Sequence, residues 1–380
     1  MTTGIKSKLL KGMLVSFTAL ICILVVFLGA VTVLSLKNTR EQIPVLPEAS
    51  IMNRFDALVG DALADAEAGA RSVRKKFWLD EDVTEGPVPN PDCYGTSDDP
   101  STLGWLLEDA SFLLEGQDTL FSTDIELKPG SEVIYYLDES IFAVTWQQVI
   151  NDYVYTISEV KVSHPSQFRR QIADSTYNSK NYYTVAAMSQ QVNAVVGSSA
   201  DHYRGRKFGT KVYEGIVRSV VLPEGCDVCY IDRNGDLILS HRGELMDMES
   251  VQKFVDENDI DFSISFGPIL IEDGVRCDPP SYALGEVNDK YPRAALCQMD
   301  TLHYLVVVGN SEKKYFGTPT IHDFAEVIDT FGCQKAYAMD GGNTGAIFMN
   351  GKIINVPSLG YERVVSDIIY FCSAVPDSSQ

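Results

Sequence analysis

The stretch Val133–Val162 reads VIYYLDESIFAVTWQQVINDYVYTISEVKV and contains three strand-like runs in succession. Short polar segments separate the runs, and one of them is Asn151-Asp152, whose residue types favour turns. Runs rich in β-branched and aromatic residues between such turns predict strands that pair with their neighbours in sequence. We therefore expect an antiparallel meander from this point of the chain.

The rest of the chain interleaves further strands with helices. Two hairpins are predicted at Asp227–Ser240 and Ala346–Val356, because each contains Asn-Gly, a strong two-residue turn signal. The predicted helices are His164–Arg170, Tyr183–Gln191, Met248–Asn258 and Thr320–Phe331, and the predicted single strands are Asn193–Gly197, Asp261–Leu270, Leu302–Gly309, Lys335–Met339 and Arg363–Cys372. The expected class is α+β, a mixed and largely antiparallel β-sheet with flanking helices, preceded by one N-terminal transmembrane helix.

Composition and charge restrict the possible partners. The 380 residues include 31 Lys+Arg and 52 Asp+Glu, for a net charge of −21, with 45% hydrophobic residues. These are the proportions of a globular protein, which excludes disordered, collagen-like and small disulfide-rich classes. A strongly acidic chain is also a poor nucleic-acid binder, since phosphate contacts need a basic surface. A phosphate-bearing substrate held by a few local arginines remains compatible with this charge.

One segment predicts a membrane anchor. Met13–Leu36 is 24 residues long without a charge, and a helix of that length spans about 36 Å, enough for a hydrocarbon core of about 30 Å. A cleaved signal peptide is the alternative, but its apolar core is usually about 7–15 residues and ends at a small-residue cleavage site. We therefore favour an uncleaved single span.

Charges around this span predict its orientation. Lys6, Lys8 and Lys11 precede it without any acid, and the positive-inside rule then places the N-terminus inside the cell. The expected organisation is a cytoplasmic tail at 1–12, the anchor at 13–36, a helical stalk and acidic linker at 37–130, and a folded domain at 131–375. The expected location is the cell membrane, single-pass, with the C-terminal domain extracytoplasmic.

The cysteines and acidic turns do not identify a metal site or a cofactor. Cys226 and Cys229 form a C-x-x-C, but no second such pair or histidine pair at zinc spacing accompanies it, so we favour a structural pair or plain core cysteines. Asp232 begins a partial calcium-loop pattern, yet Gly243 stands where an EF-hand needs glutamate. Calcium thus has no specific signature here.

The sharpest candidate site is the segment DGGNT. Asp340 ends a predicted buried strand that fixes its carboxylate, and the two glycines after it let the backbone approach a ligand and present N–H groups to an anion. The alternative is an ordinary Asp-Gly turn. The candidate residues of this segment are Asp340, Gly341, Gly342, Asn343 and Thr344.

Other chemistry-bearing residues also flank predicted strands. Arg293 and Arg363 each precede a strand, and Asp201 and His202 directly follow one. Each has a plainer interpretation: either arginine can form a structural ion pair, for example Arg363 with Glu362, and His202 can be a packing residue.

Taken in order, these motifs resemble those of the phosphodiester glycosidase family, over about residues 131–372. The family includes the N-acetylglucosamine-1-phosphodiester alpha-N-acetylglucosaminidases and a bacterial, exopolysaccharide-related branch. Its F-G-P, P-R-x-A, D-G-G-x-S-S, N-G-x-x-x-N-x-P-S and E-R-x-V motifs match Phe266–Pro268, Pro292–Ala295, Asp340–Gly345, Asn350–Ser358 and Glu362–Val365.

The resemblance implies a hydrolase that cleaves a sugar-1-phosphate diester at the anomeric carbon, acting on cell-envelope or exopolysaccharide glycans. Together with the predicted span, it makes the expected protein a membrane-anchored hydrolase. The resemblance also implies Asp340 and Asp201 as catalytic carboxylates. Arginine forks bind a departing phosphate bidentately. The implied substrate and phosphate contacts are Arg293, Arg363, Gly341, Gly342, Asn343, Thr344 and Glu362.

Three motif positions differ from the family pattern. Ser199-Ala200 replaces an Asn-Gly before Asp201, Asn310 stands where an arginine is common, and Gly345 replaces the last serine of the Asp-Gly-Gly motif. A catalytically inactive glycan-binding paralogue, or an envelope structural protein, is therefore the alternative function.

Overall fold

The structure is a computed structural model that describes most of the chain from residue 125 onward. The described residues are 89–93, 106, 125–131, 133–138, 140–205, 208–278, 289–310, 318–355, 357 and 360–374. The expected tail at 1–12, the expected anchor at 13–36 and most of the expected stalk and linker lie outside them. Within the described part, no helix combines the length and the apolar character that crossing a membrane requires.

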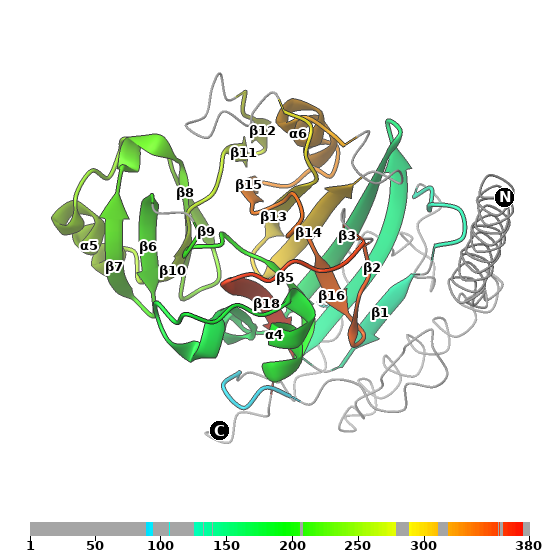
Figure 1. Ribbon diagram of the computed structural model, residues 1–380, viewed down its shortest axis with the longest axis horizontal. Coiled ribbons are helices and arrows are strands. Elements are labelled where there is room, and N and C mark those ends of the chain that lie inside the picture. Colours follow the sequence, from blue (N-terminus) through cyan, green and yellow to red (C-terminus); the bar gives the residue numbers. More distant parts are fainter. Residues whose placement is uncertain are drawn as a thin grey trace, which may run out of the picture. The chain divides into compact units, whose positions relative to one another are not determined.

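An eight-stranded antiparallel sheet forms the centre of the fold (Figure 1). The predicted meander supplies its first three strands, β1 (Ile134–Leu137), β2 (Ile141–Ile150) and β3 (Tyr153–Val162). Asn151 and Asp152 both have positive φ, which matches the twist of a tight hairpin. The sheet continues in the order β14 (His303–Asn310), β13 (Arg293–Asp300), β15 (Lys335–Met339), β11 (Ile269–Glu272) and β12 (Val275–Arg276).

Three smaller antiparallel sheets accompany the large one. The five-stranded sheet has the order β17 (Lys352–Ile353), β16 (Ile347–Met349), β5 (Ala194–Ser199), β18 (Asp367–Cys372) and β4 (Phe168–Ile172). The others are β10 (Ile260–Ile264), β8 (Val228–Asp232) and β9 (Leu237–Ser240), and the pair β6 (Gly209–Tyr213) and β7 (Ile216–Val221). Both predicted hairpins and the largely antiparallel class are confirmed.

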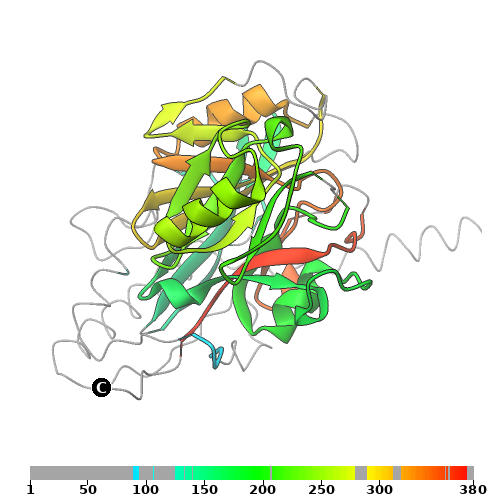
Figure 2. The same ribbon diagram turned by 90° about the vertical axis from the view of Figure 1, so that its left-hand side faces the viewer.

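Among the described residues there are three α-helices, α4 (Val185–Gln191), α5 (Met248–Glu257) and α6 (Ile321–Asp329). All three lie within predicted helical segments. In Figures 1 and 2, α6 lies beside β11 and β12, whereas α4 lies beside β5 and β18. The Thr320 hydroxyl caps α6 by accepting a hydrogen bond from the Asp323 amide, and the Asp323 carboxylate accepts one from the Thr320 amide. This pair of bonds fixes where α6 begins.

The segment after His164 was predicted wrongly as a helix. Only a 3₁₀ turn forms, at Pro165–Gln167, and the chain then enters β4, which pairs with β18. The reason is the burial period, because Phe168, Arg170 and Ile172 are buried at every second position, as a strand requires. The predicted strand Asp261–Leu270 likewise divides between β10 and β11, which belong to different sheets.

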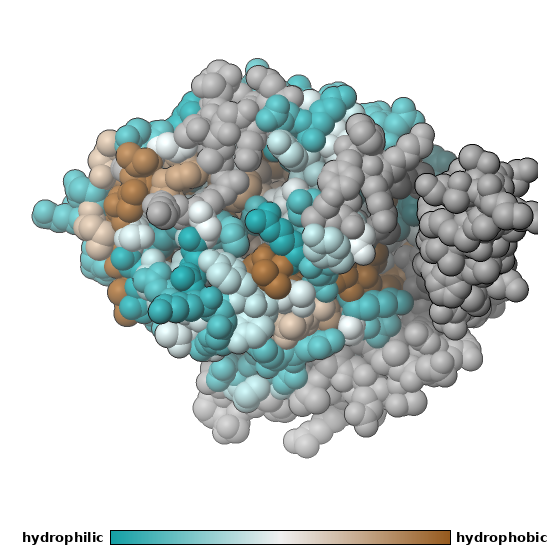
Figure 3. All heavy atoms as spheres, viewed as in Figure 1, coloured by the Kyte–Doolittle hydropathy of each residue, from teal (hydrophilic) through white to brown (hydrophobic). Residues whose placement is uncertain are grey.

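The large sheet is buried on both faces. Along β14, Val306 and Val308 pack in the same cluster as Val196 of β5 and Ile369 of β18. Leu305 and Val307 alternate with them and pack in a second cluster with α6. The large sheet therefore lies between the smaller sheets and α6, and loops that pass between the sheets converge on one site. On the face shown in Figure 3, hydrophobic side chains gather over β7, and smaller hydrophobic patches lie nearer the middle of the face.

Candidate active site

The Asp340–Gly345 segment passes from one sheet to another. It follows β15 of the large sheet and leads into β16 of the five-stranded sheet, so the interpretation of Asp-Gly as a simple hairpin turn is excluded. The Asp340 amide donates to the Ala200 carbonyl (2.8 Å), and the Ser199 hydroxyl donates to the Asp340 carbonyl (2.9 Å). The end of β15 is thereby joined to the end of β5.

Gly341 is required by a close backbone approach. A Cβ at this position would lie 2.4 Å from the Pro292 carbonyl oxygen and 3.1 Å from the Arg293 Cα, so no larger residue fits without moving the backbone. The Gly342 amide donates to the same Pro292 carbonyl (2.6 Å). These contacts press the loop that carries Asp340 against the start of β13, where Arg293 lies.

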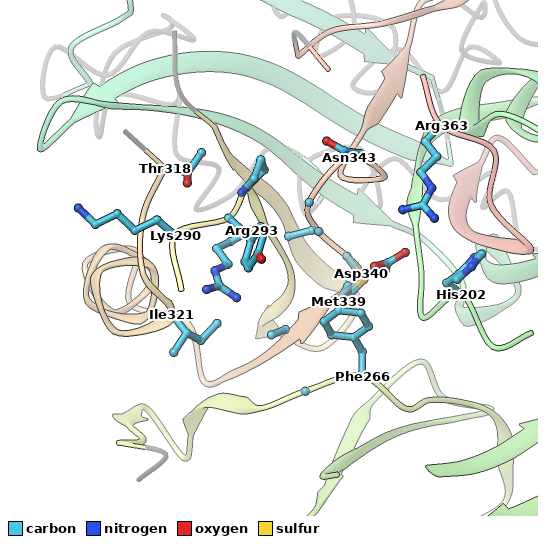
Figure 4. Close-up of a pocket in the computed structure, with 17 residues that line it drawn as sticks. His202, Phe266, Lys290, Arg293, Thr318, Ile321, Met339, Asp340, Asn343 and Arg363 are labelled. Carbon is cyan, nitrogen blue, oxygen red and sulfur yellow. The ribbon is translucent and has the colours of Figure 1, made fainter. Parts of the chain in front are cut away.

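A pocket of about 410 Å³ opens beside this loop, a size typical of sites for small ligands. Figure 4 shows Asp340, Arg363 and His202 pointing toward one another from three different loops. The described lining residues are His202, Phe266, Gly267, Lys290, Tyr291, Pro292, Arg293, Ala294, Thr318, Ile321, Ala338, Met339, Asp340, Gly341, Gly342, Asn343 and Arg363. Asp340 is the single carboxylate among them.

The opposite end of the pocket is cationic. Arg293 is only 9% exposed and donates to the backbone carbonyls of Asp289 (2.5 Å) and Pro319 (3.5 Å), which hold its guanidinium in place. Lys290 and Thr318 join it at this end (Figure 4). The Thr318 hydroxyl is buried and has no hydrogen-bond partner within the described part of the chain. Sequence analysis did not single out Lys290 or Thr318, because neither belongs to a motif.

Asp201 is not brought into the pocket. It is completely buried behind the wall, where its carboxylate pairs with the guanidinium of Arg170 (2.6 Å) and the ammonium of Lys211 (3.3 Å). The same Arg170 nitrogen also contacts Asp367 (2.9 Å). Two acids and two bases thus form a buried network under the site, a feature that the sequence did not indicate.

This network sets the protonation of both acids. Burial by itself would raise the pKa of Asp201, but Arg170, Lys211 and the Ser265 amide hold that pKa below its usual value. Burial raises the pKa of Asp367, and the neighbouring charge of Asp201 raises it further against the opposing effect of Arg170. Asp201 is therefore an ionised anchor for its two cations.

The buried network also positions two walls of the pocket. Asp367 accepts from the amides on either side of His202, those of Asp201 and Tyr203 (3.3 Å each), and so fixes His202 at a positive φ of 50°. Asp201 accepts from the amide of Ser265 (2.8 Å), the residue that precedes Phe266 in the lining. We therefore assign Asp201 to positioning the site rather than to contact with a ligand.

The remaining predicted site residues support the loops. The Glu362 carboxylate accepts from the Ala186 amide (3.0 Å) in the first turn of α4, and the Thr344 hydroxyl donates back to the Gly341 carbonyl (2.5 Å). Neither lines the pocket. Arg363 forms no ion pair with any described residue, so the proposed structural pair with Glu362 is absent from this part of the chain.

The described residues contain no group of three or more His, Cys, Asp or Glu side chains that could hold a metal ion. Cys226 and Cys229 are buried free thiols, and burial raises the pKa of the Cys229 thiol. A reactive redox pair needs an exposed thiolate, so both are core cysteines here.

Comparisons with known proteins found one family model, one curated relative and several solved structures that are similar to this chain. A family model described as phosphodiester glycosidase matches residues 190–372. The SPbeta prophage-derived uncharacterized protein YomE of Bacillus subtilis (strain 168) is 26% identical over 202 residues, which is 51% of this chain and 30% of that protein. The aligned part thus spans about a third of that relative's length.

Two solved structures are also similar. One is the catalytic domain of zebrafish N-acetylglucosamine-1-phosphodiester alpha-N-acetylglucosaminidase, with a TM-score of 0.48 and 13% identity over 61% of this chain and 83% of that one. The other is a hypothetical protein from Synechocystis, with a TM-score of 0.46 and 12% identity over 63% of each chain.

Proposed function

We propose that this protein hydrolyses a sugar-1-phosphate diester at the anomeric carbon, because its residues 190–372 match the family model described as phosphodiester glycosidase. The observation that carries the proposal is the pocket itself, in which the Asp340 carboxylate faces Arg363 and His202 while Arg293 and Lys290 line the opposite end. A sugar–phosphate diester has an electrophilic carbon beside an anion, and this pocket offers a carboxylate beside cations.

In the proposed reaction, water adds to the anomeric carbon and the bond from that carbon to the phosphate oxygen breaks. A phosphate monoester is a good leaving group, so charge stabilisation by Arg293 and Lys290 matters more than proton donation. Asp340 stabilises the positive charge on the sugar, either directly or by activating the water. The products are a free sugar and a phosphomonoester.

The proposed setting is the outer face of the cell membrane, with envelope glycans or exopolysaccharides as substrates. Support for the setting comes from the uncharged span at 13–36 and the lysines before it. Envelope glycans that carry phosphodiesters would then be within reach of the folded domain.

The test uses the detergent-solubilised full chain and the methyl phosphodiester of N-acetylglucosamine 1-phosphate. We expect release of free sugar and methyl phosphate, reduced on the order of a thousandfold or more in Asp340→Asn, with an unchanged melting temperature. Full activity in Asp340→Asn would remove this carboxylate from the mechanism, and absence of turnover by the wild type would reject the hydrolase.

A glycan-binding protein without turnover is the second candidate. The observation that favours it is that the described lining contains one carboxylate, whereas glycosidases generally use two. The same probe separates the two functions, because a binding protein would take up the intact diester, measurable by calorimetry, and release no sugar.

A further inference from the structure

A basic and aromatic surface adjoins the His202 end of the pocket. Residues 169–218 contain eight Arg+Lys and three Asp+Glu, whereas the whole chain has 31 and 52. This one segment is therefore positively charged within an otherwise acidic protein. Such segregation costs repulsion among like charges, and a segment of this kind attracts anions from solution.

Two chains of contacts lead outward from His202. The Tyr182 ring lies 5.8 Å from the His202 ring, and the Arg204 guanidinium lies 5.3 Å above the Tyr182 ring. The Tyr203 ring stacks on Tyr177 at 5.3 Å. The Arg218 guanidinium lies 5.6 Å above the Tyr177 ring. We call Tyr177, Tyr182, Arg204 and Arg218 the basic strip.

The acids of this segment do not neutralise the strip. Asp201 is buried and paired with Arg170 and Lys211. Asp174 accepts hydrogen bonds from Ser179, Asn181 and Tyr183. Glu214 reaches Arg218 at 4.0 Å, the outer limit of an ion pair.

Each arginine of the strip is half-buried and has one buried donor that no described residue satisfies. Nη1 of Arg204 and Nε of Arg218 make no hydrogen bond to any residue that the structure describes. Each guanidinium lies over a tyrosine ring. The Arg218 side chain is still 28% exposed, so its fork can reach an oxyanion at the surface. The exposed ring of Tyr182 suits the apolar face of a sugar ring, and Tyr177 beside it is half-buried.

We propose that the basic strip is a subsite for the next anionic group of the substrate, which is therefore a glycan chain with repeated phosphodiesters rather than a single sugar phosphate. The inference rests on the proposed function, because it requires that the pocket bind one sugar–phosphate unit. A chain leaving the pocket past His202 would meet Arg204 first and Arg218 further along.

The experiment compares two probes on the full chain. One is the methyl phosphodiester of N-acetylglucosamine 1-phosphate, and the other is a short oligomer of N-acetylglucosamine joined by phosphodiesters. We expect Arg204→Gln and Arg218→Gln each to raise KM for the oligomer about tenfold, the usual value of one charge-assisted contact. KM for the single unit should change less than twofold, and added salt should reduce the difference.

Arg233→Gln is the matched control, since Arg233 is exposed at the β8–β9 hairpin and pairs with Asp259 (3.4 Å). It should leave both KM values unchanged. Equal effects of the strip variants on the two probes, or none on the oligomer, would overturn the subsite. If the wild type cleaves neither probe, the proposed hydrolase fails, and calorimetric binding of the oligomer by wild type and Arg204→Gln still decides the subsite.

A separate observation concerns two cysteines that are far apart in sequence. The sulfur atoms of Cys93 and Cys372 lie 2.6 Å apart, and both residues are completely buried. Other sulfur contacts of the structure are longer, such as the 3.8 Å from Cys372 to the Gln167 carbonyl. A disulfide bond is about 2.05 Å long, so this pair needs little movement to form one.

The segment around Cys93 is already docked on the domain. The Asn90 amide donates to the Ser373 carbonyl (3.0 Å), and the Asn90 side chain donates to the Val192 carbonyl (2.9 Å). Arg169 of β4 donates to the Asp92 carbonyl (3.3 Å). Cys93 is thus held in place by its neighbours, although the sequence predicted a linker here.

We infer that Cys93 and Cys372 form a disulfide that fastens this segment to the last strand of the domain. Two thiols exchange with a small disulfide oxidant such as oxidised glutathione, which leaves as two reduced thiols while the protein sulfurs join. The bond would transmit any pull from the N-terminal side directly to β18.

The test purifies the full chain from its host without reductant, alkylates it under denaturing conditions so that buried thiols can react, and analyses its peptides by mass spectrometry. We expect a linked Cys93–Cys372 peptide that a reductant separates, while Cys226 and Cys229 carry the alkyl label. Quantitative labelling of Cys93 and Cys372 in the unreduced chain, also after incubation with oxidised glutathione, would overturn the disulfide.

Discussion

Backbone contacts on either side hold Asp340 in position. Its amide and carbonyl bond to Ala200 and Ser199, and the next residue, Gly341, fits against Pro292 with no room for a Cβ. Two sheets and the start of β13 therefore place one carboxylate. Substitutions at this residue scale should act through geometry as much as through charge.

Gly341→Ala should damage the site because the added methyl would meet the Pro292 carbonyl at 2.4 Å. We expect a stability loss of about 1–3 kcal/mol, typical of overpacking, and a loss of activity in the diester assay. Gly345→Ala is the matched control, since its Cβ would meet only ordinary contacts at 3.5 Å and beyond. Urea unfolding measures both variants, and equal losses would contradict the steric explanation.

Arg293→Ala should impair phosphodiester substrates more than neutral aryl glycosides, because its guanidinium is proposed to meet the phosphate. A drop in kcat/KM of about 10²–10³-fold is typical for one charged transition-state contact. Arg276→Ala, an exposed arginine of β12, controls for loss of charge. Equal losses on both substrate classes would argue against a phosphate contact.

At the scale of elements, the buried network joins four strands. Arg170 of β4, Asp367 of β18, Lys211 of β6 and Asp201 after β5 meet behind the pocket wall. β10 joins them through the Ser263 carbonyl, which accepts from Arg170. The network thus links the five-stranded sheet to the β6–β7 pair and to the sheet of β8, β9 and β10. We therefore expect its loss to lower the unfolding free energy of the domain.

Arg170→Met should lower the free energy of unfolding by about 3–5 kcal/mol at pH 7, because it leaves two buried carboxyl groups with one remaining cation. Arg169→Met, its neighbour on β4, bonds the Tyr370 hydroxyl and the Asp92 carbonyl and should cost much less. Urea unfolding of the two variants measures the difference. A similar cost for both would mean that the network is no more important than ordinary packing.

The cost of Arg170→Met should shrink as pH falls from 7 toward 4. In the wild type the pKa of Asp201 is depressed, so its contribution is present above the unfolded pKa of about 3.9 and is lost as pH falls. Without Arg170 the folded-state pKa of Asp201 rises. The variant therefore loses unfolding free energy only at pH values where Asp201 ionises. Unfolding free energies at several pH values test this, and a pH-independent difference would contradict it.

At the scale of the whole molecule, the proposed anchor predicts that the protein is attached to a membrane. We expect the full chain to sediment with membranes after an alkaline wash, and protease added outside intact cells to remove the folded domain. The uncharged span at 13–36 and its flanking lysines are the physical reason. Recovery of the intact chain in the soluble fraction would reject the anchor, and protection from external protease would reject the orientation.

Local patterns in the sequence determined the meander, both Asn-Gly hairpins, the three helices and the family motifs, because strand alternation, turn residues and capping act over a few neighbouring residues. Asp340, Arg293 and Arg363, which those patterns singled out, line one pocket in the structure. Only the tertiary structure decided which polar groups meet. In the structure Asp201 is buried with Arg170, and Lys290 and Thr318 join the pocket lining. The Glu362 carboxylate bonds the first turn of α4. These outcomes depend on strands that are distant in sequence but adjacent in the sheets, and no local pattern encodes such contacts.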